Sequence, residues 1–425
     1  MTDLEFIQII DRTYPWFPPA FDRDSIGIDL SNANYDSDLG QDIIEGVGFQ
    51  AQMAESLGYD GVLIFEQHGH PLALFGNALT GAAWLSGITK DISIGAIGPM
   101  MNNYQSPVRL AEEIAIVDTV SRGRLIVGLP MGIGAQYHAI GTANPAHARE
   151  RYEEGLALLD RIWNEDGAFP WEGEYFHIPN VNLWPRPIQK PRPRVFIPAA
   201  GSIESLKVAA KYRFTYQAVA VPGPKLKANI QLFKDLCNEE GYEADPSQII
   251  LVTGFFLGET QKEAERELVR HAAWNMQNIM RYATHESFPP GHVSMESLRS
   301  MLDGGYRSKG NDPGAVREMP AFGNTPEQVV EIIKEQAEEY GAGGFIVGGA
   351  FSLPNWLAHK QMQIFAEEVM PHFRPEGKPR WARQPKPGWT SASERVGRNP
   401  HYGGMPEVEI PGRGRLPLFE TDPLE

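Results

Sequence analysis

Side chains that can transfer protons lie at the end of one short apolar run in this chain. Glu66, Gln67, His68 and His70 lie where the run Gly61–Glu66 closes. A carboxylate and two imidazoles can accept and donate protons near neutral pH. A metal site would need further ligands, which the sequence does not place, so no metal is predicted. We predict Glu66, Gln67 and His68 as catalytic residues. A purely structural role, in which Glu66 satisfies backbone donors or a buried arginine, is the open alternative.

Soft apolar side chains follow two further runs. Met100-Met101 and Met131 come directly after short segments rich in Ile, Val and Gly. Methionines at such positions form an adaptable wall for an apolar ligand, and packing in the core accounts for them equally well. Aromatic residues in two loops add to this wall. The predicted substrate pocket consists of Trp16, Met100, Met101 and Tyr137.

A serine marks a candidate anion site. Ser202 follows Gly201 where an apolar run passes into a helical segment, and Ser205 lies in the first turn. Free N–H groups at a helix start bind phosphate, and a serine hydroxyl adds a donor. The segment Arg149–Tyr152 begins another helix and is placed to reach the same anion. An ordinary helix cap without a ligand is the alternative.

Eight apolar runs, bounded by Gly, Pro or Asp, predict buried strands. They are Glu5–Ile10, Gly61–Glu66, Ile92–Gly98, Arg124–Leu129, Arg194–Gly201, Tyr216–Val221, Ile249–Gly258 and Gly343–Ala350. Segments with helical periodicity alternate with them. The main ones are Gln41–Leu57, Pro107–Val120, His147–Trp163, Ile203–Tyr212, Lys225–Glu240, Gln261–Tyr282, Pro326–Tyr340 and Asn355–Val369.

This alternation predicts an α/β fold with parallel strands and crossover helices. Eight units close most naturally into a TIM-like (β/α)8 barrel, whose active site lies at the carboxyl ends of the strands. An open doubly wound sheet would place a glycine-rich turn after the first strand, and Asp11–Pro15 is not one.

Three insertions and a tail interrupt the repeating units. The insertions follow strands 1, 4 and 7, at Arg12–Leu39, Asn164–Pro193 and His285–Asn324. The second is expected to hold a hairpin, and the other two are either lids over the site or surface loops. We expect one barrel domain over residues 1–373 and an extended tail over residues 374–425, which is rich in Pro, Gly and Arg.

Composition restricts the function classes. The single cysteine, Cys237, excludes an intrachain disulfide and favours a reducing, cytoplasmic compartment. The net charge of −16 argues against a nucleic-acid partner. No run of eighteen apolar residues predicts a membrane span, and the first ten residues lack the features of a secretory signal.

The ordered segments resemble the bacterial luciferase-like family of flavin-dependent monooxygenases over roughly residues 40–260 and 320–375. The segments that carry the resemblance are 58–68 (GYDGVLIFEQH), 106–132 (SPVRLAEEIAIVDTVSRGRLIVGLPMG), 149–163, 175–202, 323–333 and 365–375. The family fold is a TIM-like barrel with an insertion, which agrees with the eight predicted units.

The resemblance implies reduced FMN (FMNH2) as cofactor, delivered by a separate NAD(P)H:flavin reductase. O2 then forms a C4a-peroxyflavin, which oxygenates a small organic substrate. The resemblance also implies a homo-oligomer, either a dimer or a tetramer. By position, Ser202 and Tyr152 match phosphate-binding residues of the family, and Glu66 and His68 match its proton-transfer residues. The predicted cofactor-binding residues are Gly98, Pro99, Met131, Tyr152, Gly201, Ser202 and Ser205.

Three departures from the family pattern matter. Gln67 stands where luciferase has its catalytic histidine, so either His68 takes that role or no base is needed there. Met131 stands where luciferase has a phosphate-binding arginine. The family often has a cis peptide at the end of strand three, and a cis bond costs least before proline, so we predict a cis Gly98–Pro99 bond.

Two other functions stay open. Relatives on this fold use deazaflavin for hydride transfer, which needs no O2. A flavin-binding protein without catalysis is the third candidate, although a bare scaffold needs no enclosed apolar pocket.

Overall fold

The apolar runs assemble into a closed parallel barrel. The computed structural model describes residues 3–18, 30–69, 71–132, 136, 139–141, 144–219, 223–278, 294–295, 299, 323–348, 353–374, 377–383, 407–412 and 414–417. The barrel strands are β1 (Glu5–Ile9), β2 (Gly61–Phe65), β3 (Ser93–Ile97), β4 (Leu125–Gly128), β7 (Arg194–Ala199), β8 (Thr215–Ala218), β9 (Ile249–Thr253) and β10 (Gly344–Val347). Their order around the barrel is β1-β10-β9-β8-β7-β4-β3-β2. All eight predicted strands and the TIM-like fold are therefore confirmed.

Alternating side chains divide the barrel into two apolar layers. One set fills the interior, and it comprises Ile7, Ile9, Leu63, Ile97, Ile126, Phe196, Ile250 and Ile346. The other set points outward and packs against the helices, as Phe6, Val62 and Ile94 do. Because both faces of every strand are covered, the strands consist of nearly continuous apolar residues.

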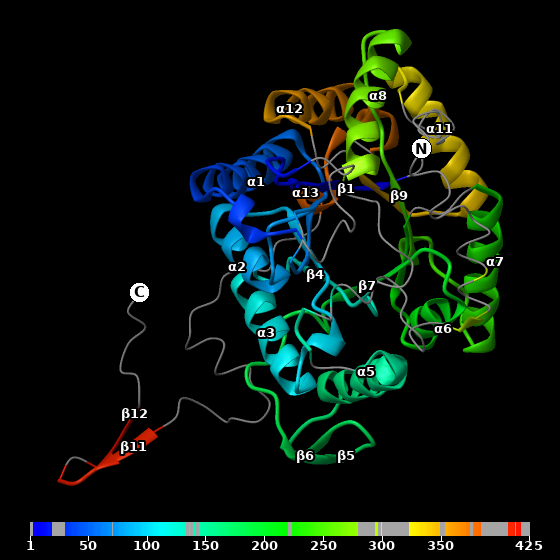
Figure 1. Ribbon diagram of the computed structural model, residues 1–425. Coiled ribbons are helices and arrows are strands. Elements are labelled where there is room, and N and C mark those ends of the chain that lie inside the picture. The colour runs from blue at the N-terminus through cyan, green and yellow to red at the C-terminus, as the bar shows by residue number, and fades with distance from the viewer. Residues whose placement is uncertain are drawn as a thin grey trace. The chain divides into compact units, whose positions relative to one another are not determined.

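Helices surround the barrel (Figure 1). They are α1 (Ser37–Leu57), α2 (Ala78–Ile88), α3 (Pro107–Val120), α5 (Ala148–Asn164), α6 (Ile203–Lys211), α7 (Gly223–Glu239), α8 (Gln261–Asn278), α11 (Pro326–Tyr340) and α12 (Asn355–Ile364). The sequence pattern did not predict α2. Gly81 and Gly87 lower its helix propensity, and it is apolar on most sides, so its periodicity is weak.

The expected hairpin is present and is bonded to a barrel helix. Strands β5 (Phe169–Glu172) and β6 (His177–Val181) pair in antiparallel fashion. Glu154 of α5 accepts hydrogen bonds from the backbone N–H groups of Glu174, Tyr175 and Phe176, at 2.9–3.0 Å. The third expected insertion lies almost wholly outside the described residues.

The chain divides into two units, Met1–Trp381 and Ala382–Glu425. The expected boundary at residue 373 lies slightly earlier, and the residues in between contact the barrel: the Trp381 indole N–H donates to Tyr59 O at 2.9 Å. In the second unit, β11 (Glu407–Ile410) and β12 (Gly414–Pro417) form an antiparallel hairpin. The sequence predicted no periodic structure there, because four-residue strands are too short to show a reliable alternation.

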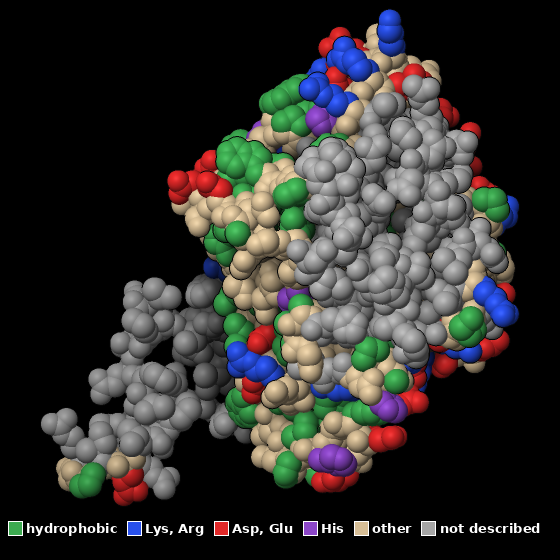
Figure 2. All heavy atoms as spheres, in the orientation of Figure 1, with side chains coloured by type: hydrophobic (Ala, Val, Ile, Leu, Met, Phe, Trp, Pro, Cys, Tyr) green, Lys and Arg blue, Asp and Glu red, His purple; other side chains and the backbone are tan. Residues whose placement is uncertain are grey.

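Charged side chains of both signs lie beside one another on the face in Figure 2. On α8, for example, Arg266 pairs with Glu267, and Glu263 pairs with Lys360 of α12. Among the described residues, no helix is long and apolar enough to cross a membrane.

Candidate active site

Glu66 and His68 meet at the carboxyl end of β2, as the sequence predicts. Oε1 of Glu66 lies 3.1 Å from His68 Nε2, and Oε2 accepts from the Ala78 N–H at the start of α2, also at 3.1 Å. Glu66 is 4% exposed. A buried carboxylate with both oxygens bonded holds a fixed orientation, so it can fix the tautomer of the imidazole beside it.

Two polar residues join this pair. Asn103 Nδ2 lies 3.0 Å from the same His68 Nε2. Since a protonated Nε2 and an amide N–H both donate, only one of these contacts is a hydrogen bond in a given tautomer. Gln67 accepts from Gln136 Nε2 at 3.4 Å, so Gln67 and His68 have different partners. The residues after β3 suggested no partner for His68, and only the fold reveals Asn103 as one.

Glycine allows β3 to end against Glu66. Gly98 has φ +122°, and a Cβ there would lie 2.7 Å from Glu66 Cβ. The predicted cis Gly98–Pro99 peptide is wrong, because the cis bonds among the described residues are Trp184–Pro185 and Lys190–Pro191. The positive φ of Gly98, which glycine adopts without steric cost, turns the chain there with a trans bond.

Ser202 caps α6 as predicted. Its Oγ accepts from the Ser205 N–H at 3.4 Å and donates to Glu204 at 2.7 Å. Gly201 has φ +124°, and a Cβ there would lie 3.1 Å from Lys225 Cε and 3.4 Å from Asn229 Nδ2. The turn before the helix therefore lies against the Lys225 side chain and the Asn229 amide, both from α7. Both types of group donate hydrogen bonds to anions.

The segment Arg149–Tyr152 begins the helix after β4, which is the neighbour of β7 in the barrel. Nε and Nη1 of Arg149 are buried and have no hydrogen-bond partner within the part of the chain that the structure describes. Arg151 instead donates to Met101 O and Tyr104 O. The Tyr152 hydroxyl donates to Leu129 O at 2.7 Å, and burial raises its pKa above the ordinary value. Among the described residues, Arg149 is therefore the member of this segment whose N–H donors are not all hydrogen-bonded.

The methionines lie in closely packed surroundings. Met100 and Met101 are 0% and 1% exposed, and Met101 packs so closely on α5 that a Cβ at Gly155 would lie 2.5 Å from its sulfur. Met131 is also buried, whereas Trp16 is 61% exposed. Tyr137 and His70 lie outside the described residues. The assignment of these residues to a pocket wall stays a prediction.

The predicted site residues did not include the two ionisable residues that follow β1. Asp11 and Arg12 are 3% and 6% exposed. Asp11 Oδ2 accepts from the Phe65 N–H, while Oδ1 has no partner among the described residues. Burial raises the pKa of the Asp11 carboxyl well above its ordinary value. The only signal in the sequence was two adjacent ionisable residues at a strand end.

Known proteins share this architecture. The family model described as luciferase-like monooxygenase matches residues 30–343. The oxygenase component of a flavin-dependent trigonelline monooxygenase from Acinetobacter baylyi is 27% identical over 76% of this chain and 88% of its own length. An FMN complex of the oxygenating constituent of 3,6-diketocamphane monooxygenase from Pseudomonas putida superposes with a TM-score of 0.63, at 19% identity, covering 87% of this chain and 99% of its own.

A solved F420-dependent secondary alcohol dehydrogenase has the same fold, with a TM-score of 0.61 and 19% identity over 88% of this chain and all of its own. The family match spans most of the sequence, and the named relatives are monooxygenases. This chain belongs to the luciferase-like monooxygenase family and is an enzyme of the flavin-dependent monooxygenase class.

Proposed function

We propose that the protein is the oxygenase of a two-component system that uses reduced FMN and O2 to oxygenate a small organic molecule. The observation that carries the proposal is a pair of unsatisfied donors on Arg149, which follows β4, the barrel strand next to the one that leads into the Ser202 cap. Buried polar groups are normally bonded, so the exceptions need an explanation. Arg149 Nε and Nη1 are such exceptions among the described side chains. A phosphate monoester would satisfy both of them.

The residues present fit the phosphate end of FMN. The Arg149 guanidinium supplies two donors, the first N–H groups of α6 supply more, and Gly201 leaves room for close approach. Glu204, which accepts from Ser202, would have to release that hydroxyl before an anion binds. Tyr152, whose hydroxyl is bonded to Leu129 O, would support the turn rather than bind the phosphate.

Glu66 and His68 would together accept and hold a proton during the reaction. With Nε2–H directed at Glu66, the lone pair of His68 lies on Nδ1, which can accept a proton from the reacting molecule. The resulting imidazolium would be stabilised by the Glu66 carboxylate 3.1 Å away. Bound FMN in its reduced state would supply the activation of O2. The buried apolar surroundings would exclude water from that reaction.

The proposed partners follow from this chemistry. Reduced FMN would come from a separate NAD(P)H:flavin reductase, and the fact that the trigonelline relative is an oxygenase component supports this. We also propose that the barrel domain alone carries the activity, that the protein works in the cytoplasm, and that it forms a homo-oligomer.

Anaerobic titration with photoreduced FMN, followed by rapid mixing with O2, tests the function. We expect the protein to bind reduced FMN and to slow its oxidation relative to free solution. If reduced FMN is oxidised as fast as in free solution, the monooxygenase proposal is rejected. Hydride transfer from a reduced deazaflavin without O2 would then be the candidate to measure.

Riboflavin, which lacks the phosphate, provides the matched control for the binding site. We expect Arg149→Gln to weaken reduced FMN binding by about tenfold to hundredfold, which corresponds to the loss of a charged hydrogen bond. Riboflavin binding should not change. An equal effect on both flavins would remove Arg149 from the phosphate site.

A further inference from the structure

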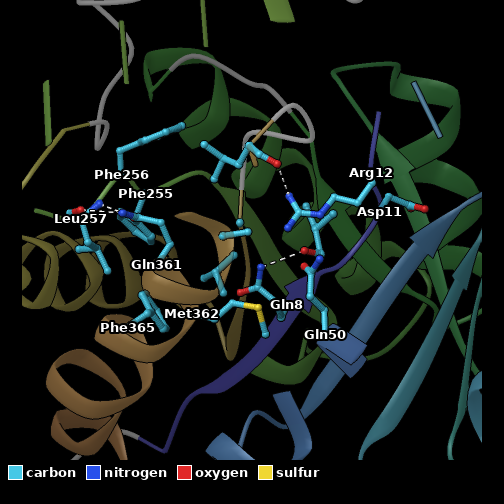
Figure 3. A pocket seen from close by; sticks show the side chains of 15 residues that line it. Gln8, Asp11, Arg12, Gln50, Phe255, Phe256, Leu257, Gln361, Met362 and Phe365 are labelled. Atoms are coloured by element: carbon cyan, nitrogen blue, oxygen red, sulfur yellow. Dashed lines mark hydrogen bonds between the residues drawn. The ribbon is translucent and has the colours of Figure 1, made fainter. Parts of the chain in front are cut away.

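A cavity lies away from the Ser202 cap, between the carboxyl ends of β1, β9 and β10 and the helix α12 (Figure 3). Its empty space, counted together with the open solvent at its mouth, is about 550 Å³. Much of its lining is apolar and comes from Phe255, Leu257, Met362 and Phe365. Polar side chains also line it, and Figure 3 shows Gln8, Arg12 and Gln50 together on one side. The cavity therefore has an apolar part and a polar part.

Arg12 is a buried cation that lacks an acidic partner among the residues that the structure describes. Its Nη1 donates to Leu353 O at 3.0 Å, and the Gln50 side-chain oxygen accepts from Nε and Nη2, both at 2.7 Å. These acceptors are neutral, and no carboxylate of the described chain pairs with Arg12. Burial lowers the pKa of Arg12 to about 10, and no acidic neighbour opposes that shift. Buried arginines are normally paired, because an isolated buried charge is costly.

The neighbouring carboxylates do not serve Arg12. Asp11 is bonded to the Phe65 N–H on its other oxygen, and its raised pKa favours the neutral form. Glu66 has both oxygens engaged by His68 and Ala78. Arg12 thus keeps its positive charge at the cavity with no carboxylate partner among the described residues.

The phosphate of a flavin is not the missing anion. Strand β1, which Arg12 follows, lies opposite β7, which Ser202 follows, in the eight-strand order. A flavin whose phosphate lies at Ser202 and Arg149 would therefore carry it on the far side of the barrel. The anion for Arg12 must come from another molecule.

We propose that this cavity binds an organic carboxylate, with the carboxylate group on Arg12 and the hydrocarbon body against Phe255, Met362 and Phe365. Gln50 holds the guanidinium in a fixed orientation, which favours planar, two-point recognition of a carboxylate. The carboxylate belongs either to the substrate of the proposed monooxygenase or to a separate small effector.

Benzoate and its neutral isostere benzamide test the proposal by calorimetric titration of the full chain. We expect the wild type to bind benzoate about tenfold to hundredfold more tightly than benzamide. Arg12→Gln should remove this preference. Arg149→Gln, at the proposed phosphate site on the other side of the barrel, should leave benzoate binding unchanged. Equal binding of the two probes by the wild type, binding of neither, or an unchanged preference in Arg12→Gln would overturn the proposal.

Arg12→Lys covers the case in which the glutamine variant does not fold. It keeps the charge but loses the two-point geometry, so benzoate should bind more weakly than to the wild type and still more tightly than benzamide. Wild-type affinity in Arg12→Lys would exclude guanidinium recognition.

A second arm separates the two sources of the carboxylate and is the one step that rests on the proposed function. Benzoate is added to the complex with reduced FMN, and the flavin spectrum and its oxidation rate are recorded. A change in either places the carboxylate beside the flavin, as a substrate group. Tight benzoate binding with neither changed identifies a separate effector site. Because benzoate binding is measured without flavin, its failure and that of the monooxygenase are distinguishable.

Discussion

The two ends of the barrel hold buried charge in different ways. At the amino end, Arg194 donates to both oxygens of Glu5, at 2.9 and 2.7 Å. Asp60 accepts from Arg374 at 2.9 Å and from the Phe6 and Arg380 backbone N–H groups. Every carboxylate oxygen of Glu5 and Asp60 therefore has a donor.

At the carboxyl end, three buried or half-buried ionisable groups lack such partners. Asp11 Oδ1 and two nitrogens of Arg149 are unbonded within the described chain. Among the described residues, Arg12 is bonded only to neutral acceptors. Glu66 is the exception, since His68 and Ala78 engage both its oxygens. The comparison teaches that the amino end uses charge for stability, whereas the carboxyl end keeps charge available for ligands, as expected for a barrel enzyme.

Breaking a pair at the amino end should give the largest effect. Arg374→Met removes the cation 2.9 Å from Asp60, and both side chains are nearly inaccessible to solvent. The buried carboxylate then has no charge partner, so we expect the free energy of unfolding to fall by about 3–5 kcal/mol. Urea unfolding measures the change.

The double variant Asp60→Asn/Arg374→Met is the control for that experiment. It removes both charges, so it should recover part of the lost stability, because no unpaired charge remains. A loss below about 1 kcal/mol in the single variant would show that the pair contributes as little as an exposed one.

The fold could be predicted because periodicity and strand bounds depend on nearby residues. The runs at Glu5–Ile10 and Gly343–Ala350 match β1 and β10, which lie far apart in sequence and pair side by side. Helix α2 was not predicted, because its glycines and its uniform apolarity remove the amphipathic periodicity that marks the other helices. The hairpin β11–β12 was not predicted, because its strands are too short to show a clear alternation of apolar and polar residues.

The site was predictable only in part, for a physical reason. Glu66 and His68, two positions apart at a strand end, and Ser202 before a helix are local features that a sequence displays. Which acceptors surround Arg12 or Arg149 depends on residues from distant segments, and Leu353, whose carbonyl oxygen accepts from Arg12, is one example. Unsatisfied groups are therefore visible only once every neighbour is placed.

Neutralising an unpaired acid at the carboxyl end should have the opposite sign. Asp11→Asn keeps an acceptor for the Phe65 N–H and removes a buried ionisable group. The folded-state pKa of Asp11 lies above the unfolded value of about 3.9, so the folded state keeps its proton where the unfolded state has lost it. The stability of the wild type therefore falls as pH rises through this range, and that of the variant does not.

We expect Asp11→Asn to be more stable than the wild type by about 1–3 kcal/mol at pH 8, with a smaller difference near pH 4.5. Urea unfolding at both pH values measures this. Asp42→Asn, at an exposed position of α1, serves as the control and should show no such growth with pH. The same stability difference at both pH values would refute the raised pKa of Asp11.

The smallest expected effect distinguishes a cap that only stabilises its helix from one that also binds a ligand. Ser202 and Ser106 both cap helices, and their hydroxyls accept from backbone N–H groups at 3.4 and 3.3 Å. Replacing either by alanine should lower the free energy of unfolding by about 1 kcal/mol. Because only Ser202 belongs to the proposed phosphate site, only Ser202→Ala should also weaken reduced FMN binding, by about fivefold. Equal FMN affinities in the two variants would reduce Ser202 to an ordinary cap and place the phosphate elsewhere.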